Sequence, residues 1–188
     1  MEDNVPYNQL VKNLTDPSDP LFGGSLAYIN VELSLAMIIK LMKIKLKKPS
    51  DSSPFYENTI LICSSVMPFA HEMITKDGEI FASLRGTSIA TEKDEIIEGI
   101  FPKSLAFLSN LTLINSFLDT LIENTTSSLK NDYIMLKTNL IGSFTNLASI
   151  LKFEVNKMAD LTKRDEHINQ IDDIIMKQRL QDNKGDNQ

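Results

Sequence analysis

The chain has very few cysteines and histidines. One cysteine, Cys63, and two histidines, His71 and His167, occur among its 188 residues. A lone cysteine has no partner for an internal disulfide, which favours a reducing compartment, and we expect a cytoplasmic protein. The histidines lie far apart in the sequence, and neither has a cysteine or carboxylate at metal-ligand spacing beside it. We therefore expect no metal site.

Strand patterns and common active-site motifs are also missing. No segment sustains the alternation of apolar and polar residues that marks a half-buried strand. Neither a serine-triad motif nor a phosphate-loop motif is present. The length suits one domain, and no repeat or linker divides the chain. We expect an all-α domain over residues 1–180, followed by a polar tail at 181–188.

Acidic residues outnumber basic residues in this chain. The chain has 19 lysines and arginines against 25 aspartates and glutamates, which gives a net charge of −6. This balance argues against a general nucleic-acid binder. The lysines between residues 40 and 48 have no aromatic residues among them, and we interpret them as a solvated helix end. The first residues are acidic and no apolar stretch follows them, so we expect neither a signal peptide nor a membrane span.

Apolar residues recur at spacings of three and four along most of the chain, which predicts helices. Proline removes one backbone hydrogen bond and costs on the order of 3 kcal/mol inside a helix. Pro68 and Pro102 should therefore each kink or break a helix, which gives a bundle of six to eight helices. The helical patterns cover residues 5–14, 24–47, 55–84, 91–121, 132–158 and 163–180.

The most apolar pattern runs from residue 26 to residue 39. Its only strongly polar side chains are Asn30, Glu32 and Ser34. Such a helix is apolar on every side for most of its length, so it should be buried inside the protein. The apolar run is too short and too interrupted to span a bilayer.

The start of this helix is a candidate binding site. The free N–H groups of Gly24, Ser25 and Leu26 should point out of the helix. Gly23 and Gly24 have no side chains to block an approaching ligand, so an anion or a carbonyl oxygen would fit there. A simple turn with Ser25 near the helix N-cap would explain the same residues without a ligand.

Two carboxylates are candidates for acid–base chemistry. Asp77 lies near the end of a helix that is apolar enough to be buried, and Asp132 lies where a polar loop becomes a helix. A buried carboxylate can move protons if its surroundings tune its pKa. Acidic residues at such junctions are more often solvated or capping residues, and both interpretations stay open on spacing alone.

Four short segments follow one another in a definite order. They are residues 20–25 (Pro-Leu-Phe-Gly-Gly-Ser), 77–81 (Asp-Gly-Glu-Ile-Phe), 100–102 (Ile-Phe-Pro) and 128–132 (Ser-Leu-Lys-Asn-Asp). With these four segments in this order, the chain resembles the cyclodeaminase/cyclohydrolase family over nearly its whole length. That family includes the C-terminal domain of formiminotransferase-cyclodeaminase and small methenyltetrahydrofolate cyclohydrolases.

The resemblance implies an all-helical homodimer that acts on a tetrahydrofolate derivative. The implied reaction is ring closure of a formimino-folate with loss of ammonia, or hydrolysis of a methenyl bridge. It makes Asp77 the acid–base candidate and Asp132 an orienting or pterin-contacting group. These residues and the glycine loop should then converge on one cleft. The residues that the resemblance implies for substrate binding are Gly23, Gly24, Ser25 and Ser128.

The chain departs from the family pattern at several of these positions. Leu21 and Phe22 replace the family's proline and first glycine, and Ile150 and Glu154 stand where the family has asparagines. Three functions therefore stay open. The chain is an active folate enzyme, a catalytically lapsed helical dimer that binds another small molecule or acts as a subunit, or an adaptor that uses its C-terminal helix as a partner surface.

Overall fold

The computed structural model describes residues 7–16, 19, 21, 23–47 and 52–185. Within these residues every regular element is an α-helix, so the predicted all-α class is confirmed. Six helices are described, at the lower end of the expected number. They are α1 (Tyr7–Thr15), α2 (Gly23–Leu46), α3 (Ser53–Gly86), α4 (Ala90–Glu123), α5 (Leu129–Val155) and α6 (Leu161–Gly185).

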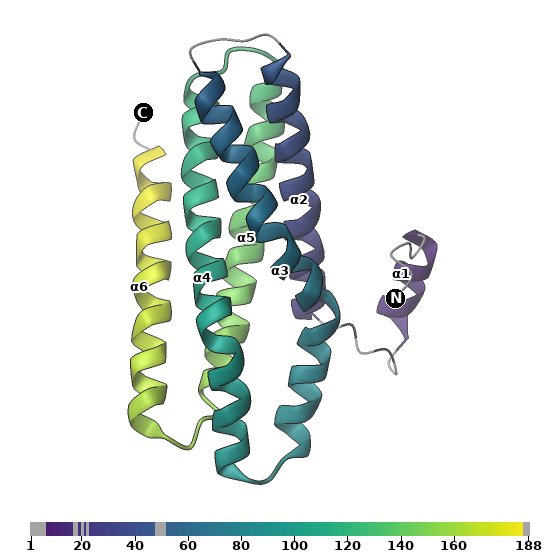
Figure 1. Ribbon diagram of the computed structural model, residues 1–188, viewed down its shortest axis with the longest axis vertical. Coiled ribbons are helices and arrows are strands. Elements are labelled where there is room, and N and C mark those ends of the chain that lie inside the picture. Colours follow the sequence, from purple (N-terminus) through teal and green to yellow (C-terminus); the bar gives the residue numbers. More distant parts are fainter. Residues whose placement is uncertain (1–6, 17–18, 20, 22, 48–51, 186–188) are drawn as a thin grey trace.

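The four helices α2 to α5 form an elongated bundle, and α6 packs against α4 and α5 (Figure 1). The helix α1 lies to one side of the bundle (Figure 1). Helices α2 and α5 contact each other although the sequence separates them widely, and they run in opposite directions (Figure 1). The start of α2 is therefore at the same end of the bundle as the end of α5.

The core is made of apolar side chains that recur every three or four residues and meet between the helices. Burying one such side chain contributes roughly 1.5–3 kcal/mol. Among the buried residues are Val31, Leu35 and Ile38 of α2, Leu108, Leu111 and Ile114 of α4, and Leu136, Leu140 and Leu147 of α5. The stripes predicted on residues 105–121 and 132–158 thus face this core.

The two interior prolines do not break their helices. The helix α3 continues through Pro68 and α4 continues through Pro102 and Gly99, so the predicted breaks are wrong. Both prolines are exposed, and water can satisfy the backbone carbonyls that they leave without a donor. The tertiary packing of the helical turns on either side of each proline stabilises the helix by more than the lost hydrogen bond costs. The helix α3 does change direction along its length (Figure 1).

The C-terminal helix is longer than its apolar pattern predicted. It runs to Gly185, so residues 181–185 are helical instead of frayed, and residues 186–188 lie outside the described part. Polar contacts support this extension. The Gln178 side chain donates to Asp182 and accepts from the buried Asn115 of α4, and Asp182 lies 3.6 Å from the Lys137 ammonium of α5.

The helix α2 is not buried on every side. Leu33 is 65% exposed, and Leu26, Met37 and Ile44 are exposed on the same helix. These four residues recur at spacings of seven, four and seven, which places them in one line along the helix. We call this line the α2 stripe. The expectation of a fully buried helix is therefore wrong, because the core covers only one face.

By length and composition alone, α2 and α4 could each cross a membrane. About half of the apolar window in each, 50% in α2 and 44% in α4, is buried within the bundle. Core helices of soluble proteins have the same property. The expected absence of a membrane span therefore stays a prediction.

Candidate functional site

The first turn of α2 lies directly against Asp77 of α3. A Cβ atom placed on Gly24 would overlap both carboxylate oxygens of Asp77. Glycine at this position therefore lets the carboxylate approach the backbone of α2. The main chain of Ser25 hydrogen-bonds the Asp77 carboxylate. Ser25 itself lies in the first turn of the helix and is buried.

Asp77 is an unusual acid because it is only 6% exposed. Burial raises the pKa of Asp77, while the hydrogen bond from the Ser25 main chain acts in the opposite direction. The positive end of the α2 helix dipole also favours a negative charge there. Asp77 is therefore a buried carboxyl group with a defined donor, as an acid–base role requires.

Glu154 of α5 is a second buried carboxyl group at the same place, and it is 6% exposed. Burial and the nearby charge of Asp77 raise the pKa of Glu154 to about 7, and Lys157 acts against this shift. Within the described part of the chain, the Glu154 side chain makes no hydrogen bond or ion pair. A carboxyl group with these properties titrates near neutral pH.

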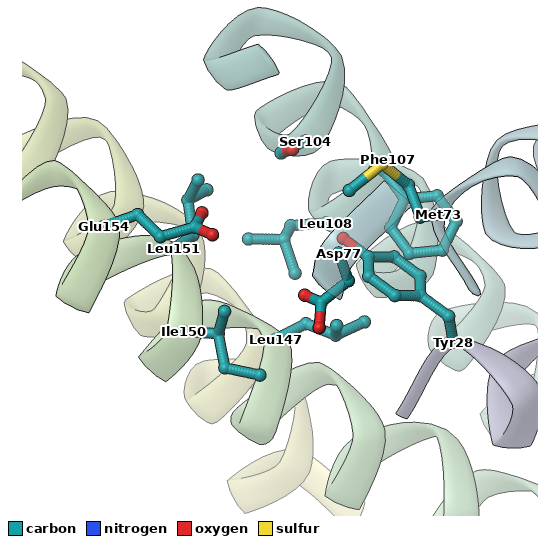
Figure 2. Close-up of a pocket in the computed structure, with 10 residues that line it drawn as sticks. All are labelled: Tyr28, Met73, Asp77, Ser104, Phe107, Leu108, Leu147, Ile150, Leu151 and Glu154. Atoms are coloured by element: carbon teal, nitrogen blue, oxygen red, sulfur yellow. The ribbon is translucent and has the colours of Figure 1, made fainter. Parts of the chain in front are cut away.

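A small cavity lies between these two acids, and we call it the inner cavity. In Figure 2 the carboxyl groups of Asp77 and Glu154 approach it from two sides, with the Tyr28 ring beside Asp77. The space open to the centre of a water molecule is about 10 Å³, which is room for about one water. Its lining residues are Tyr28, Met73, Asp77, Ser104, Phe107, Leu108, Leu147, Ile150, Leu151 and Glu154.

Aromatic packing holds one wall of the inner cavity. The ring of Tyr28 lies 6.3 Å from Phe69 and 5.6 Å from Phe107, centroid to centroid. Burial, with the charges of Asp77 and Glu154, raises the pKa of the Tyr28 hydroxyl. Tyr28 is therefore a neutral hydroxyl at neutral pH and can act as a hydrogen-bond partner beside the acids.

A larger pocket opens outside the same acids, and we call it the outer pocket. It offers about 190 Å³ to the centre of a water molecule. Asp77 and Glu154 line the outer pocket as well as the inner cavity, so they stand between the two spaces. The residues that line the outer pocket are Gly23, Gly24, Asp77, Phe81, Ile150, Phe153 and Glu154.

The aromatic side of the outer pocket carries positive charge. The ammonium of Lys157 lies 5.1 Å from the ring centroid of Phe81 and 4.3 Å from that of Phe153. The guanidinium of Arg85 lies 5.6 Å from the Phe81 centroid. Partial burial and the neighbouring cations Lys93 and Arg85 lower the pKa of Lys157, while Glu154 acts in the opposite direction. The pocket thus combines buried acids with aromatic walls, and the half-buried Lys157 and the exposed Arg85 lie beside those walls.

The structure brings together only part of the predicted site. Gly23, Gly24 and Asp77 line the outer pocket, and the Ser25 main chain contacts Asp77. Asp132 and Ser128 lie at the opposite end of α5. At about 1.5 Å per helical residue, Asp132 is about 33 Å from Glu154.

The predicted convergence is therefore wrong for Asp132 and Ser128 within one chain. Asp132 was chosen because it lies at a loop–helix junction, and Ser128 because the family resemblance implies it. The starts of α2 and α5 are two such junctions, but antiparallel packing puts them at opposite ends of the bundle (Figure 1). Asp132 is half-buried and Ser128 is exposed.

Sequence reasoning did not select Glu154 as a site residue. Its position falls in line with the buried Leu147 and Leu151, at spacings of seven and three. A glutamate in register with an apolar stripe is expensive to bury as a charge. This alignment with the buried leucines is the sequence signal that could have identified Glu154 as a site residue.

No group of three histidine, cysteine or acidic side chains within the described part of the chain could hold a metal ion. The two acids at the site have no third such ligand beside them there. The expected absence of a metal stays a prediction.

Replacing Gly24 by alanine should damage the site and the fold together. The new methyl group would displace the Asp77 carboxylate and separate it from the Ser25 main chain. Overpacking of this kind costs roughly 1–3 kcal/mol. Gly23→Ala is the matched control, because nothing lies within 4 Å of a Cβ at that position. Denaturant unfolding should show the loss for Gly24→Ala alone, and equal stability of the two variants would contradict the packing described.

Glu154 should make stability depend on pH. Its pKa is raised from 4.5 to about 7 by burial and by Asp77. Between these values the folded chain holds a proton that the unfolded chain has lost, so this contribution to stability falls as pH rises through the window. At about 1.4 kcal/mol per pKa unit, the full loss is about 3 kcal/mol.

Glu154→Gln cannot titrate, so its stability relative to the natural chain should rise by about 2–3 kcal/mol between pH 5 and pH 8. Denaturant unfolding at the two pH values measures this change. Glu79→Gln, at an exposed position of α3, serves as the control and should show no such gain. A pH-independent difference for Glu154→Gln would contradict the burial of an ionisable group.

Comparison with known proteins places the fold. No protein-family model matches the sequence, and no curated protein sequence matches it. Among solved structures, the fold is similar to that of formiminotetrahydrofolate cyclodeaminase from Thermotoga maritima, with a TM-score of 0.84 and 12% sequence identity. The match covers 97% of this chain and 94% of that one. The chain therefore has the fold of a folate cyclodeaminase.

Proposed function

We propose that the chain is a folate one-carbon enzyme, acting as a formimino-tetrahydrofolate cyclodeaminase or a methenyl-tetrahydrofolate cyclohydrolase. The observation that carries the proposal is the contact between the glycine start of α2 and the buried Asp77, at the floor of an open pocket. The likeness of the fold to a folate cyclodeaminase supports the same substrate class.

Both reactions need a group that moves protons beside a one-carbon centre bonded to nitrogen. In ring closure, the free amine nitrogen next to the pterin ring attacks the formimino carbon and loses a proton, and ammonia then leaves. In hydrolysis, water attacks the methenyl carbon and loses a proton instead. Asp77 is buried, faces the pocket and has its pKa raised by burial. Asp77 is therefore suited to accept that proton in either reaction.

The remaining pocket residues fit the parts of a folate. The backbone at Gly23 and Gly24, which lines the outer pocket, can bind a polar edge of the pterin. Phe81 and Phe153 offer flat apolar surfaces to an aromatic ring. Lys157 and Arg85 lie beside these rings, where they can attract the carboxylates of the folate tail. A ligand that is polar at one end, aromatic in the middle and anionic at the other end matches this order.

Asp77→Asn should abolish turnover while leaving folate binding nearly intact, because it keeps the shape of the side chain and removes the titratable group. Calorimetric titration with reduced folates measures binding, and the absorbance of methenyl-folate measures turnover. Glu79→Gln, two residues further along α3 and exposed, is the control and should keep its activity. Full turnover by Asp77→Asn would exclude Asp77 as the catalytic acid–base.

A catalytically lapsed relative is the second candidate, and one observation favours it. Ile150 and Glu154, which stand where the resembled family has asparagines, both line the outer pocket. An isoleucine there removes a hydrogen-bonding group from the wall of the pocket. Folate binding without turnover by the natural chain would support this candidate over the active enzyme.

We also propose that the chain forms a homodimer through the α2 stripe. Leu26, Leu33, Met37 and Ile44 form an exposed apolar line along the face of α2 that does not meet the core. Spacings of seven and four let such a line pack against the same line on a second copy. Burial against a second copy would remove these side chains from water.

Leu33→Asp should therefore dissociate the dimer, because it places a charge in the middle of the α2 stripe. Light scattering at micromolar concentration measures the assembly state. Met176→Asp is the matched control, since Met176 is an exposed apolar residue on α6, away from the α2 stripe. A monomeric natural chain, or equal effects of the two substitutions, would overturn this interface.

A further inference from the structure

Glu154 is the most unusual group at the site. It is 6% exposed, and no described residue hydrogen-bonds its carboxyl group or forms an ion pair with it. In Figure 2 it reaches into the inner cavity from α5, while Asp77 reaches the same space from α3. The carboxyl oxygens of Glu154 are not among the fully enclosed polar atoms without a partner in the described part of the chain, so water or a ligand in the outer pocket can reach them.

Asp77 and Glu154 are both accessible from the outer pocket. Both line the outer pocket, so a ligand seated there would meet both of them together. Both also line the inner cavity, which has room for about one water between them. The two groups thus have a common contact with a ligand and a second connection through the cavity.

We propose that Glu154 is a second proton-carrying group of the site, and that Glu154 and Asp77 hold one proton between them at neutral pH. This inference rests on the proposed function for its catalytic part. The sharing of the proton does not depend on that function and can be measured without a substrate.

The surroundings decide which of the two acids holds the proton. Asp77 receives a hydrogen bond from the Ser25 main chain and lies at the positive end of α2, so its charged form is the better stabilised. Glu154 has no such donor, and burial together with the charge of Asp77 raises its pKa to about 7. Two carboxylates that line the same small cavity in a low-dielectric site cannot both ionise easily.

The other groups around Glu154 do not change this order. Among the described residues, α6 contributes none to the lining of either space, and α4 contributes the uncharged Ser104 to the inner cavity. The titratable or charged groups near Glu154 are Tyr28 of α2, Asp77 of α3 and Lys157 of its own helix, with Lys93 of α4 and Arg85 of α3 acting on Lys157.

A shared proton suits ring closure because that reaction needs one proton acceptor and one proton donor. As the free amine nitrogen next to the pterin ring forms its bond to the carbon of a protonated formimino group, the Asp77 carboxylate takes the proton from that nitrogen. As the bond from this carbon to the amino group breaks, the Glu154 carboxylic acid protonates the amino group, and ammonia leaves with the bonding electrons.

The product is the methenyl cation, and the pair still holds one proton, now on Asp77. The inner cavity has room for one water to return this proton to Glu154 before the next turnover. Charge and atoms therefore balance over the cycle, and no metal or redox partner is needed.

The test is the pH profile of turnover in the natural chain, Glu154→Gln and Glu154→Asp. Turnover by the natural chain should rise as Asp77 ionises and fall above about pH 7 as Glu154 ionises. Glu154→Gln should lower kcat on the order of 100-fold, the usual effect of losing a general acid, with little change in KM, and should lose the alkaline decline. Glu154→Asp keeps the acid and should restore part of kcat together with that decline.

A Glu154→Gln enzyme with normal kcat and an unchanged alkaline decline would overturn the catalytic part of the inference. If the natural chain turns over no folate, the proposed function fails, and proton sharing is decided by a second measurement. Carbon NMR titration of labelled glutamate side chains should show Glu154 titrating near neutral pH. It should titrate at lower pH in Asp77→Asn, which removes the neighbouring charge.

An ordinary glutamate titration in the natural chain, or one that Asp77→Asn leaves unchanged, would overturn the sharing itself. Glu79→Gln is the control for both experiments because that residue is exposed on α3 and lines neither space. It should leave the pH profile and the Glu154 titration unchanged.

Discussion

The close approach of the Asp77 carboxylate to the backbone at Gly24 is the contact on which the site depends. It requires a glycine in α2 and a short acid in α3, facing each other where the two helices pack. It places a buried acid at the positive end of a helix, where the Ser25 main chain can hydrogen-bond it. The antiparallel course of α5 then brings Glu154 to the same place. The outer pocket opens above this arrangement.

The sequence predicts much of this fold because helical periodicity is a local property. Leu108, Leu111 and Leu118 are spaced so that one helical face is apolar, and that face is buried. The same local reasoning failed at Pro68 and Pro102, because it weighs the lost hydrogen bond but not the tertiary packing of the turns on either side. It also overstated the burial of α2, because composition does not say which face meets the core.

The candidate site was predicted only in part, since it depends on which helix ends meet. Gly24 and Asp77 were selected from their segments, and the packing of α2 on α3 brings them together. Asp132 was selected from a similar junction, yet the length of α5 carries it away from the pocket. Glu154 is the last residue but one of α5, but the helical pattern in the sequence runs on to residue 158, so sequence reasoning placed it inside a helix and passed over it. The carboxyl group of Glu154 belongs to the site only because Asp77 lies on the other side of the inner cavity.

The central claim is that a reduced folate binds above Asp77 at the start of α2, and a calorimetric titration tests it most directly. The natural chain should bind a reduced folate, and so should the control Gly142→Ala, because a Cβ on Gly142 of α5 meets nothing within 4 Å and Gly142 lines neither space. Gly24→Ala, folded under the same conditions, should bind it at least tenfold more weakly, because its methyl group displaces Asp77 from the floor of the pocket. No binding by the natural chain, or equal affinity of all three proteins, would contradict this account.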